Sequence, residues 1–113
     1  MEAGRKATIM KKIHLIQKRP DLRPWSAPEG YPVYESGYWA LSEKKARSLI
    51  GGEIYFYEKR TAPSFLGGVI ENIRLKQEDP WKGRIIFTFR SAPEYEGKRT
   101  SKDRWGMEKK IES

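Results

Sequence analysis

The chain of 113 residues contains no cysteine and only one histidine, His14. The absence of cysteine excludes disulfide bonds and zinc sites built from cysteine ligands. A single histidine leaves no histidine cluster to bind a metal, and a Ser-His-Asp triad would have to use His14 as its base. The sequence therefore predicts no metal and no cofactor.

Long apolar runs and nucleotide-binding motifs are also absent. No stretch is long enough to cross a bilayer or to form the core of a signal peptide, so we expect a cytoplasmic protein without a membrane partner. Phosphate-binding loops and dinucleotide fingerprints are missing. Aromatic residues make up 12% of the chain, which argues against disorder although 34% of residues are charged. The length suits one domain, residues 1–113, with a loose tail at 1–6.

The formal net charge of +8 is concentrated at the two ends of the sequence. Residues 1–24 hold seven Lys and Arg against two acidic residues, and residues 97–113 hold six against three. The middle of the chain, 25–96, is balanced. If the two ends meet in the fold, they form one basic patch that attracts phosphate by electrostatic steering and counterion release.

The sequence pattern predicts a mainly β fold with one clear helix. Ser42 is a good N-cap and Gly51 a natural residue after a helix end, so a short helix is expected between them, with an apolar stripe of Ala46, Leu49 and Ile50. Prolines indicate a loop over 19–32, and turn residues indicate loops over 77–83 and 91–102. Strands are expected over residues 7–18, 34–40, 54–57, 67–75, 84–90 and 104–111.

Alternation along the strands assigns their faces. Ile54 and Phe56 share one face, and Tyr55 and Tyr57 share the other. In the strand over 84–90, the apolar Ile85, Phe87 and Phe89 are expected inward, with Arg84, Thr88 and Arg90 outward. In the strand over 67–75, Val69, Ile73 and Leu75 fall on one face, with Ile70, Asn72 and Arg74 on the other. Glu71 shares the parity of the first set, and a β-bulge is expected to turn it outward.

The order of helix, glycine turn, aromatic strand, loop and glycine-led strand resembles the PUA-like superfamily, and within it the EVE branch most closely. The resemblance covers roughly residues 37–75. It implies an α+β, mainly β fold: a twisted mixed β-barrel of five or six strands with one or two short flanking helices. It also implies RNA binding, and EVE and YTH relatives hold a modified base in an aromatic pocket. The matching positions are Trp39, Ala46-Arg47, Gly52-Glu53, Phe56-Tyr57 and Gly68-Val69.

A nucleic-acid site needs flat surfaces for a base, polar groups for its edge and cations for its phosphates. The candidate base pocket consists of Trp39, Tyr55, Tyr57 and Phe65, with Ser36 and Asn72 to read the base edge. The candidate phosphate-binding residues are Lys11, Lys12, Lys59, Arg60, Lys98, Arg99, Lys102 and Arg104.

The sequence thus predicts a nucleic-acid-binding module, for RNA or DNA, that holds an unpaired or modified base. Two alternatives stay open. One is a small nuclease that uses His14 with nearby Lys and Glu. The other is a protein-interaction or accessory module from a mobile element, for which an exposed patch of Trp25, Trp81 and Trp105 would be the mark.

Overall fold

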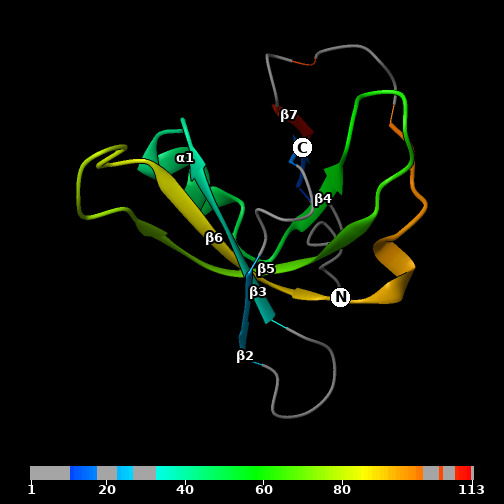
Figure 1. Cartoon of the computed structure of the whole chain (residues 1–113), viewed down its shortest axis with the longest axis horizontal. Coiled ribbons are helices and arrows are strands. Elements are labelled where there is room, and N and C mark those ends of the chain that lie inside the picture. The colour runs from blue at the N-terminus through cyan, green and yellow to red at the C-terminus, as the bar shows by residue number, and fades with distance from the viewer. Residues whose placement is uncertain (1–10, 18–22, 27–32, 101–104, 106–108, 113) are drawn as a thin grey trace, which may run out of the picture.

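The computed structural model describes residues 11–17, 23–26, 33–100, 105 and 109–112, with the backbone alone for 23–26. Within these residues, one short α-helix, α1 (Glu43–Ser48), and one 3₁₀ turn, η3 (Pro93–Tyr95), accompany a large sheet (Figure 1). The strands are β1 (Lys12–Ile16), β2 (Arg23–Ser26), β3 (Val33–Trp39), β4 (Glu53–Tyr57), β5 (Leu66–Leu75), β6 (Ile85–Ser91) and β7 (Lys109–Glu112).

All seven strands belong to one mixed sheet in the order β2-β3-β6-β5-β4-β1-β7. The pairing of β1 with β4 is parallel and the other pairings are antiparallel. The predicted mainly β fold with a mixed sheet is confirmed. The edge strands β2 and β7 do not pair within the described part of the chain, so closure into a barrel stays a prediction. Because β1 and β7 are neighbours, strands from the two basic ends of the chain lie side by side.

The sheet has one strand more than expected because β2 lies inside the proline-rich segment predicted as a loop. Arg23–Ser26 pairs antiparallel with β3, with a register shift between Pro24 and Ser26. A proline is tolerated at the edge of a sheet, where its missing N–H interrupts no ladder. The loop prediction for residues 19–32 is therefore wrong at 23–26.

The hydrophobic core lies against one face of the sheet and under α1. On β4 the predicted alternation is confirmed, since Ile54 and Phe56 enter the core while Tyr55 and Tyr57 do not. On β6 the prediction fails at Thr88, which is buried together with Ile86, because both faces of this central strand are covered. The core comprises Ile13, Leu15, Trp39, Ala46, Leu49, Ile54, Phe56, Ile70, Ile73, Ile85, Phe87 and Phe89.

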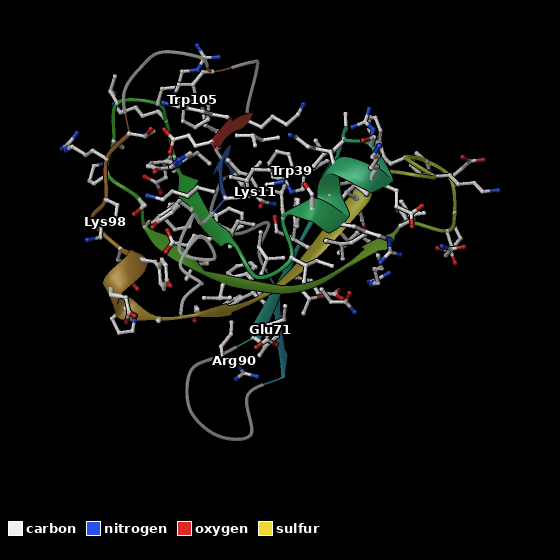
Figure 2. All side chains as sticks on the ribbon, turned by 180° about the vertical axis from the view of Figure 1, so that it is seen from behind. Lys11, Trp39, Glu71, Arg90, Lys98 and Trp105 are labelled. Atoms are coloured by element: carbon white, nitrogen blue, oxygen red, sulfur yellow. The ribbon has the colours of Figure 1, made fainter. Side chains whose placement is uncertain are left out.

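A register shift in β5 between Ile70 and Asn72 has the effect of the predicted bulge. It lets both Ile70 and Ile73 reach the core, so the expected grouping of Ile70 with Asn72 was wrong. The outward turn of Glu71 is confirmed: its Oε2 accepts a hydrogen bond from Arg90 Nε at 2.8 Å (Figure 2). Earlier in the same strand, a Cβ at Gly68 would collide with the Arg90 carbonyl oxygen, so glycine permits the close approach of β5 to β6.

Helix α1 begins at the predicted N-cap, since the Ser42 hydroxyl accepts a hydrogen bond from the Lys45 N–H at 3.1 Å. Ile50 is 39% exposed and falls outside the buried stripe, because the helix already ends at Ser48. Gly51, with φ +89°, then turns the chain, and its N–H bonds the Ile70 carbonyl at 2.8 Å. This turn sets the start of β4, which carries the two tyrosines of the site.

Candidate functional site

The face of β4, β1 and β7 that points away from the core is rich in polar and aromatic side chains. His14 on β1 lies opposite Tyr55 on β4 and Lys110 on β7. Directly opposite residues share a face, and side chains alternate along each strand. Since the odd-numbered Ile13 and Leu15 enter the core, the even-numbered residues of β1 lie on the other face with their partners. That face holds Lys12, His14, Glu53, Tyr55, Tyr57, Lys110 and Glu112.

A buried serine fastens the segment after η3 beside this face. The Ser64 hydroxyl donates to the Tyr95 carbonyl at 2.7 Å and accepts from the Lys98 N–H at 2.9 Å. Its backbone N–H also donates to the Lys98 carbonyl at 2.7 Å. The next residue, Arg99, donates from its guanidinium to the Thr61 carbonyl at 2.7 Å. Ser64 therefore positions the two cations that face the sheet.

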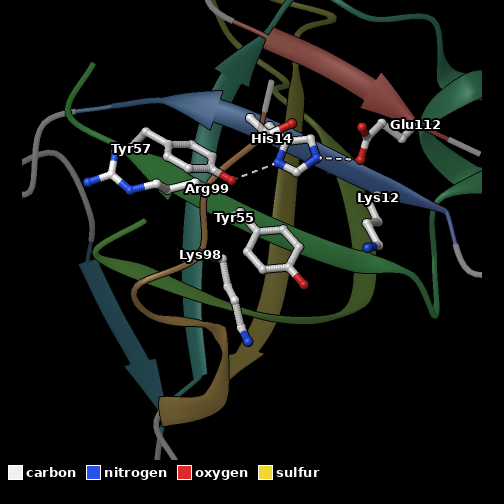
Figure 3. Close-up of a pocket in the computed structure, with 8 residues that line it drawn as sticks. Lys12, His14, Tyr55, Tyr57, Lys98, Arg99 and Glu112 are labelled. Atoms are coloured by element: carbon white, nitrogen blue, oxygen red, sulfur yellow. Dashed lines mark hydrogen bonds and ion pairs between the residues drawn. The ribbon is translucent and has the colours of Figure 1, made fainter. Parts of the chain in front are cut away.

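A cavity of about 330 Å³ lies between the polar face and the segment 98–100. Its volume is at the lower end of the range of roughly 300–1,000 Å³ common for small-ligand sites. Figure 3 shows Arg99 beside Tyr57 on one side of His14, and Glu112 with Lys12 on the other. The cavity is lined by Lys12, His14, Tyr55, Tyr57, Lys98, Arg99, Thr100 and Glu112.

His14 occupies the centre of a hydrogen-bonded chain. Its Nε2 lies 2.9 Å from Glu112 Oε1 and its Nδ1 lies 2.9 Å from the Tyr57 hydroxyl oxygen. Because a carboxylate only accepts, these partners assign the proton of neutral His14 to Nε2, so that Nδ1 accepts from Tyr57. The ring also stacks on Tyr55, with centroids 5.3 Å apart and planes inclined by 16°.

The pKa values follow from burial and from this chain. Burial lowers the pKa of His14 from its ordinary value of 6.5, and the hydrogen bond to Glu112 opposes that shift. The hydrogen bond from His14 lowers the pKa of Glu112, which keeps its carboxylate ionised. Burial raises the pKa of both Tyr55 and Tyr57, so the phenols remain neutral. Both tyrosines line the cavity as neutral phenols, with Tyr55 7% and Tyr57 1% exposed.

Two further contacts connect the strands of the site. The Tyr55 hydroxyl donates to Glu53 Oε1 at 2.7 Å. The Lys110 ammonium, 3% exposed, donates to Thr100 Oγ1 at 2.8 Å and lies 3.8 Å from Glu112 Oε2. A buried charge requires such partners, and here they tie β7 to the segment that carries Lys98 and Arg99.

Trp105 covers Tyr57 from the side. Its ring meets the Tyr57 ring edge-on, with centroids 5.9 Å apart and planes at 87°. The Arg60 guanidinium lies 5.8 Å from the Trp105 ring centroid, the geometry of a cation–π contact. Arg60 therefore contacts a residue that packs on the site, but it does not line the cavity.

The structure brings five of the predicted residues together at this cavity. Tyr55 and Tyr57 come from the predicted base pocket, and Lys12, Lys98 and Arg99 come from the predicted phosphate-binding set. The cations come from both basic ends of the sequence, which meet because β1 pairs with β7.

Trp39 and Ser36 belong to the interior, so their assignment to the pocket was wrong. Trp39 is 8% exposed and packs in the core (Figure 2). Its indole Nε1 donates to Ser36 Oγ at 3.1 Å, and that hydroxyl donates to Gln17 Oε1 at 2.5 Å. The three side chains satisfy one another's polar groups, as buried polar groups must.

Phe65 also lies elsewhere than predicted. It packs against Phe56, with ring centroids 6.5 Å apart, and lines a second cavity of about 500 Å³. That cavity contains Glu58 and Glu96 but no Lys or Arg among its lining residues, which does not suit a phosphate.

Of the remaining predicted residues, Asn72, Lys59 and Lys11 do not line the Tyr55–Tyr57 cavity. Asn72 is exposed on β5 after the bulge, and Lys59 is exposed in the turn after β4. Lys11 has the opposite parity to Lys12 and contributes its carbonyl, which accepts from the Glu53 N–H at 2.9 Å. Lys102 and Arg104 lie outside the described residues.

Three lining or supporting residues were not predicted: Thr100, Lys110 and Glu112. The alternation of Lys110 and Glu112 in the last strand was a usable signal, since it places both on one face. Local periodicity does not show which distant strand pairs with this one, so the pairing of β7 with β1 could not be predicted.

The tryptophan patch expected for a protein-interaction module is not formed by the described tryptophan side chains. Trp105 packs beside Tyr57, whereas Trp81 is 53% exposed in the turn between β5 and β6 at the opposite end of the sheet (Figure 1). The side chain of Trp25 lies outside the described residues. Trp81 instead contacts Arg84, whose guanidinium carbon lies 4.7 Å from the ring centroid.

Comparison with known proteins found no matching family model, no matching curated protein and no matching solved structure. Within the described ranges, no three His, Asp or Glu side chains are grouped as a metal site would require. The one α-helix in those ranges is too short to cross a membrane.

Proposed function

We propose that this protein is a nucleic-acid-binding module that takes an unpaired base into the cavity beside Tyr55 and Tyr57. The main support for this proposal is that two tyrosine rings and three cationic side chains line the same cavity. Aromatic rings beside cations that follow the phosphate backbone are the usual means of binding single strands. The phosphates would lie at Lys98 and Arg99, which are exposed at one side of the cavity.

The PUA-like assignment, including a closed barrel, is part of this proposal. Helix α1, the turn at Gly51 and Gly52, and the aromatic strand β4 follow one another in the order that the resemblance requires. The mixed sheet also agrees with it. A base held in an aromatic pocket is what that resemblance implies, and the Tyr55–Tyr57 cavity is the place in this chain that suits it.

A matched pair of charge reversals tests the proposal. Lys98→Glu changes the charge at the cavity but keeps the backbone bonds of residue 98 to Ser64. Lys82→Glu makes the same change in net charge in the turn between β5 and β6, at the far end of the sheet. Binding of fluorescent single-stranded RNA and DNA is measured by anisotropy at low salt. We expect Lys98→Glu to weaken binding about tenfold and Lys82→Glu to change it about twofold at most.

Two results would refute the proposal. One is a wild-type protein that binds neither RNA nor DNA at low salt. The other is an equal loss for both variants, because binding would then follow net charge and not the cavity. Circular dichroism of each variant verifies that it is folded.

RNA cleavage is a second candidate function, favoured by the chain Glu112–His14–Tyr57. A histidine oriented by a carboxylate and bonded to a hydroxyl has the arrangement of an activated general base. In such a step the 2′-hydroxyl of RNA would pass its proton to the Tyr57 oxygen while Tyr57 passes its own to His14. The 2′-oxygen would bond to phosphorus, and the leaving 5′-oxygen would take a proton from water.

Labelled RNA incubated with the wild type and with His14→Ala decides this candidate. Cleavage by the wild type that the variant lacks would support it, and the matching deoxy substrate should stay intact because it has no 2′-hydroxyl. Equal cleavage by both proteins, or none by either, would refute the proposed nuclease activity of His14.

A further inference from the structure

Among the described residues, Glu112 is the only carboxylate that lines the cavity, and it lies with Lys12 on one side of His14 (Figure 3). Glu112 lines the cavity beyond one edge of the His14 ring, while Arg99 lies beyond the other (Figure 3). The hydrogen bond from His14 fixes Glu112 Oε1 and favours the ionised carboxylate. A phosphate near Glu112 would be repelled, so the phosphate belongs near Lys98 and Arg99. The Glu112 side is left for the base.

Glu112 has one oxygen that is not bonded to His14. Its Oε2 lies 3.8 Å from the Lys110 ammonium, and the carboxylate side chain is 41% exposed. An ionised carboxylate accepts hydrogen bonds and cannot donate them. The group that meets Oε2 must therefore be a donor, such as the exocyclic amine of a nucleobase.

The other polar groups at this end are occupied by protein contacts. Both ring nitrogens of His14 are hydrogen-bonded, and the Tyr55 hydroxyl donates to Glu53. Lys12, directly opposite Glu112 on the neighbouring strand, lines the same cavity, and its ammonium lies 3.9 Å from Glu53 Oε1. Since an ammonium carries three N–H donors, Lys12 can also donate to a ring nitrogen or carbonyl of the base. A ligand with a hydrogen-bond donor next to an acceptor would match Glu112, which accepts, and Lys12, which donates.

We propose that Glu112 makes the cavity selective for bases with an exocyclic amino group, namely cytosine, adenine and guanine, over uracil and thymine. This inference rests on the proposed function, in which the cavity receives a base. Uracil and thymine present a single ring N–H between two carbonyl oxygens, and those oxygens would face the carboxylate. Cytosine presents its amine next to an acceptor nitrogen, which suits Glu112 and Lys12 together.

The test uses oligouridine with or without one central cytosine, and the wild type beside Glu112→Gln. We expect the cytosine-containing strand to bind the wild type about fivefold more tightly or better, as one good base contact provides. Glutamine keeps the shape but can donate as well as accept, so the preference should fall to about twofold or less. Glu78→Gln, an exposed substitution in the turn between β5 and β6, should retain it.

A competition experiment on the wild type needs no variant and stays valid if Glu112→Gln does not fold. Cytidine monophosphate should displace a labelled strand at a lower concentration than uridine monophosphate. Tight binding without preference in the wild type, or an undiminished preference in a folded Glu112→Gln, overturns the role of Glu112 alone. No binding of any strand at low salt overturns the proposed function as well, so the two failures are distinguishable.

Discussion

Removing the hydroxyl of Ser64 should destabilise the protein and loosen the cationic side of its cavity. The side chain is 4% exposed and makes two hydrogen bonds, to the Tyr95 carbonyl and from the Lys98 N–H. In Ser64→Ala both backbone groups lose this partner. Leaving a buried polar group unpaired typically costs about 1–3 kcal/mol, so the free energy of unfolding should fall by about that much.

Urea unfolding followed by tryptophan fluorescence measures this loss. Ser48→Ala is the matched control, because it also removes a serine hydroxyl, here one that is exposed and donates to the Lys45 carbonyl at 2.6 Å. A surface substitution of this kind changes stability by about 0.5 kcal/mol or less. If Ser64→Ala is as stable as Ser48→Ala, the buried serine does not fasten the segment and the reasoning is wrong.

The same variant connects stability to function. The backbone bond from the Ser64 N–H to the Lys98 carbonyl survives the substitution, so the segment should stay near the sheet but move more freely. Below its melting temperature, folded Ser64→Ala should bind single-stranded RNA about fivefold more weakly, equivalent to roughly 1 kcal/mol. Unchanged affinity would show that the placement of Lys98 and Arg99 does not control binding.

Three further outcomes are expected. Urea should unfold the protein more easily on the acid side of pH 6.5 than on the alkaline side, because burial lowers the pKa of His14 and protons then favour the unfolded chain. His14→Gln should remove most of that dependence, and an equal dependence would contradict the assignment. The affinity for single-stranded RNA should fall with salt with a logarithmic slope of about −1.4, since Lys98 and Arg99 would hold phosphates and each neutralised phosphate contributes about −0.7. A slope near zero would exclude phosphate contacts. Gly68→Ala should cost roughly 1–3 kcal/mol in thermal melts, because its methyl group meets the Arg90 carbonyl; a variant as stable as the wild type would disprove that clash.

Local patterns predicted much of the fold. The alternation in Ile54–Tyr57 assigned both faces of β4, and Ser42 was recognised as a helix cap from its side chain alone. Glu71, a charged residue that alternation places on the same strand face as Val69 and Ile73, led to the prediction of the bulge. Each of these features depends on neighbours within a few residues, which is the range over which side-chain periodicity and capping operate.

The candidate site was harder to predict because it depends on contacts between distant segments. Glu112 bonds His14 across 98 positions of sequence, and nothing in either segment specifies the other. Residue type was also ambiguous: Trp39 and Tyr57 are both aromatic and both buried, yet of the two only Tyr57 lines the cavity at His14. Aromatic side chains serve cores and binding sites equally well, so only the register of β1, β4 and β7 separates the two.

The burial of His14 and its two hydrogen bonds weigh against the cleavage candidate. Both ring nitrogens are already hydrogen-bonded and His14 is only 4% exposed, so the ring serves first to hold Tyr57 and Glu112 in place. A general base must reach the proton that it removes, and His14 can do so only through the Tyr57 hydroxyl. The charged groups that line the cavity are the Glu112 carboxylate and the cations Lys12, Lys98 and Arg99. Their opposite charges suit a ligand with a donor-bearing base at one end and a phosphate at the other, which is the chemical form of a nucleotide.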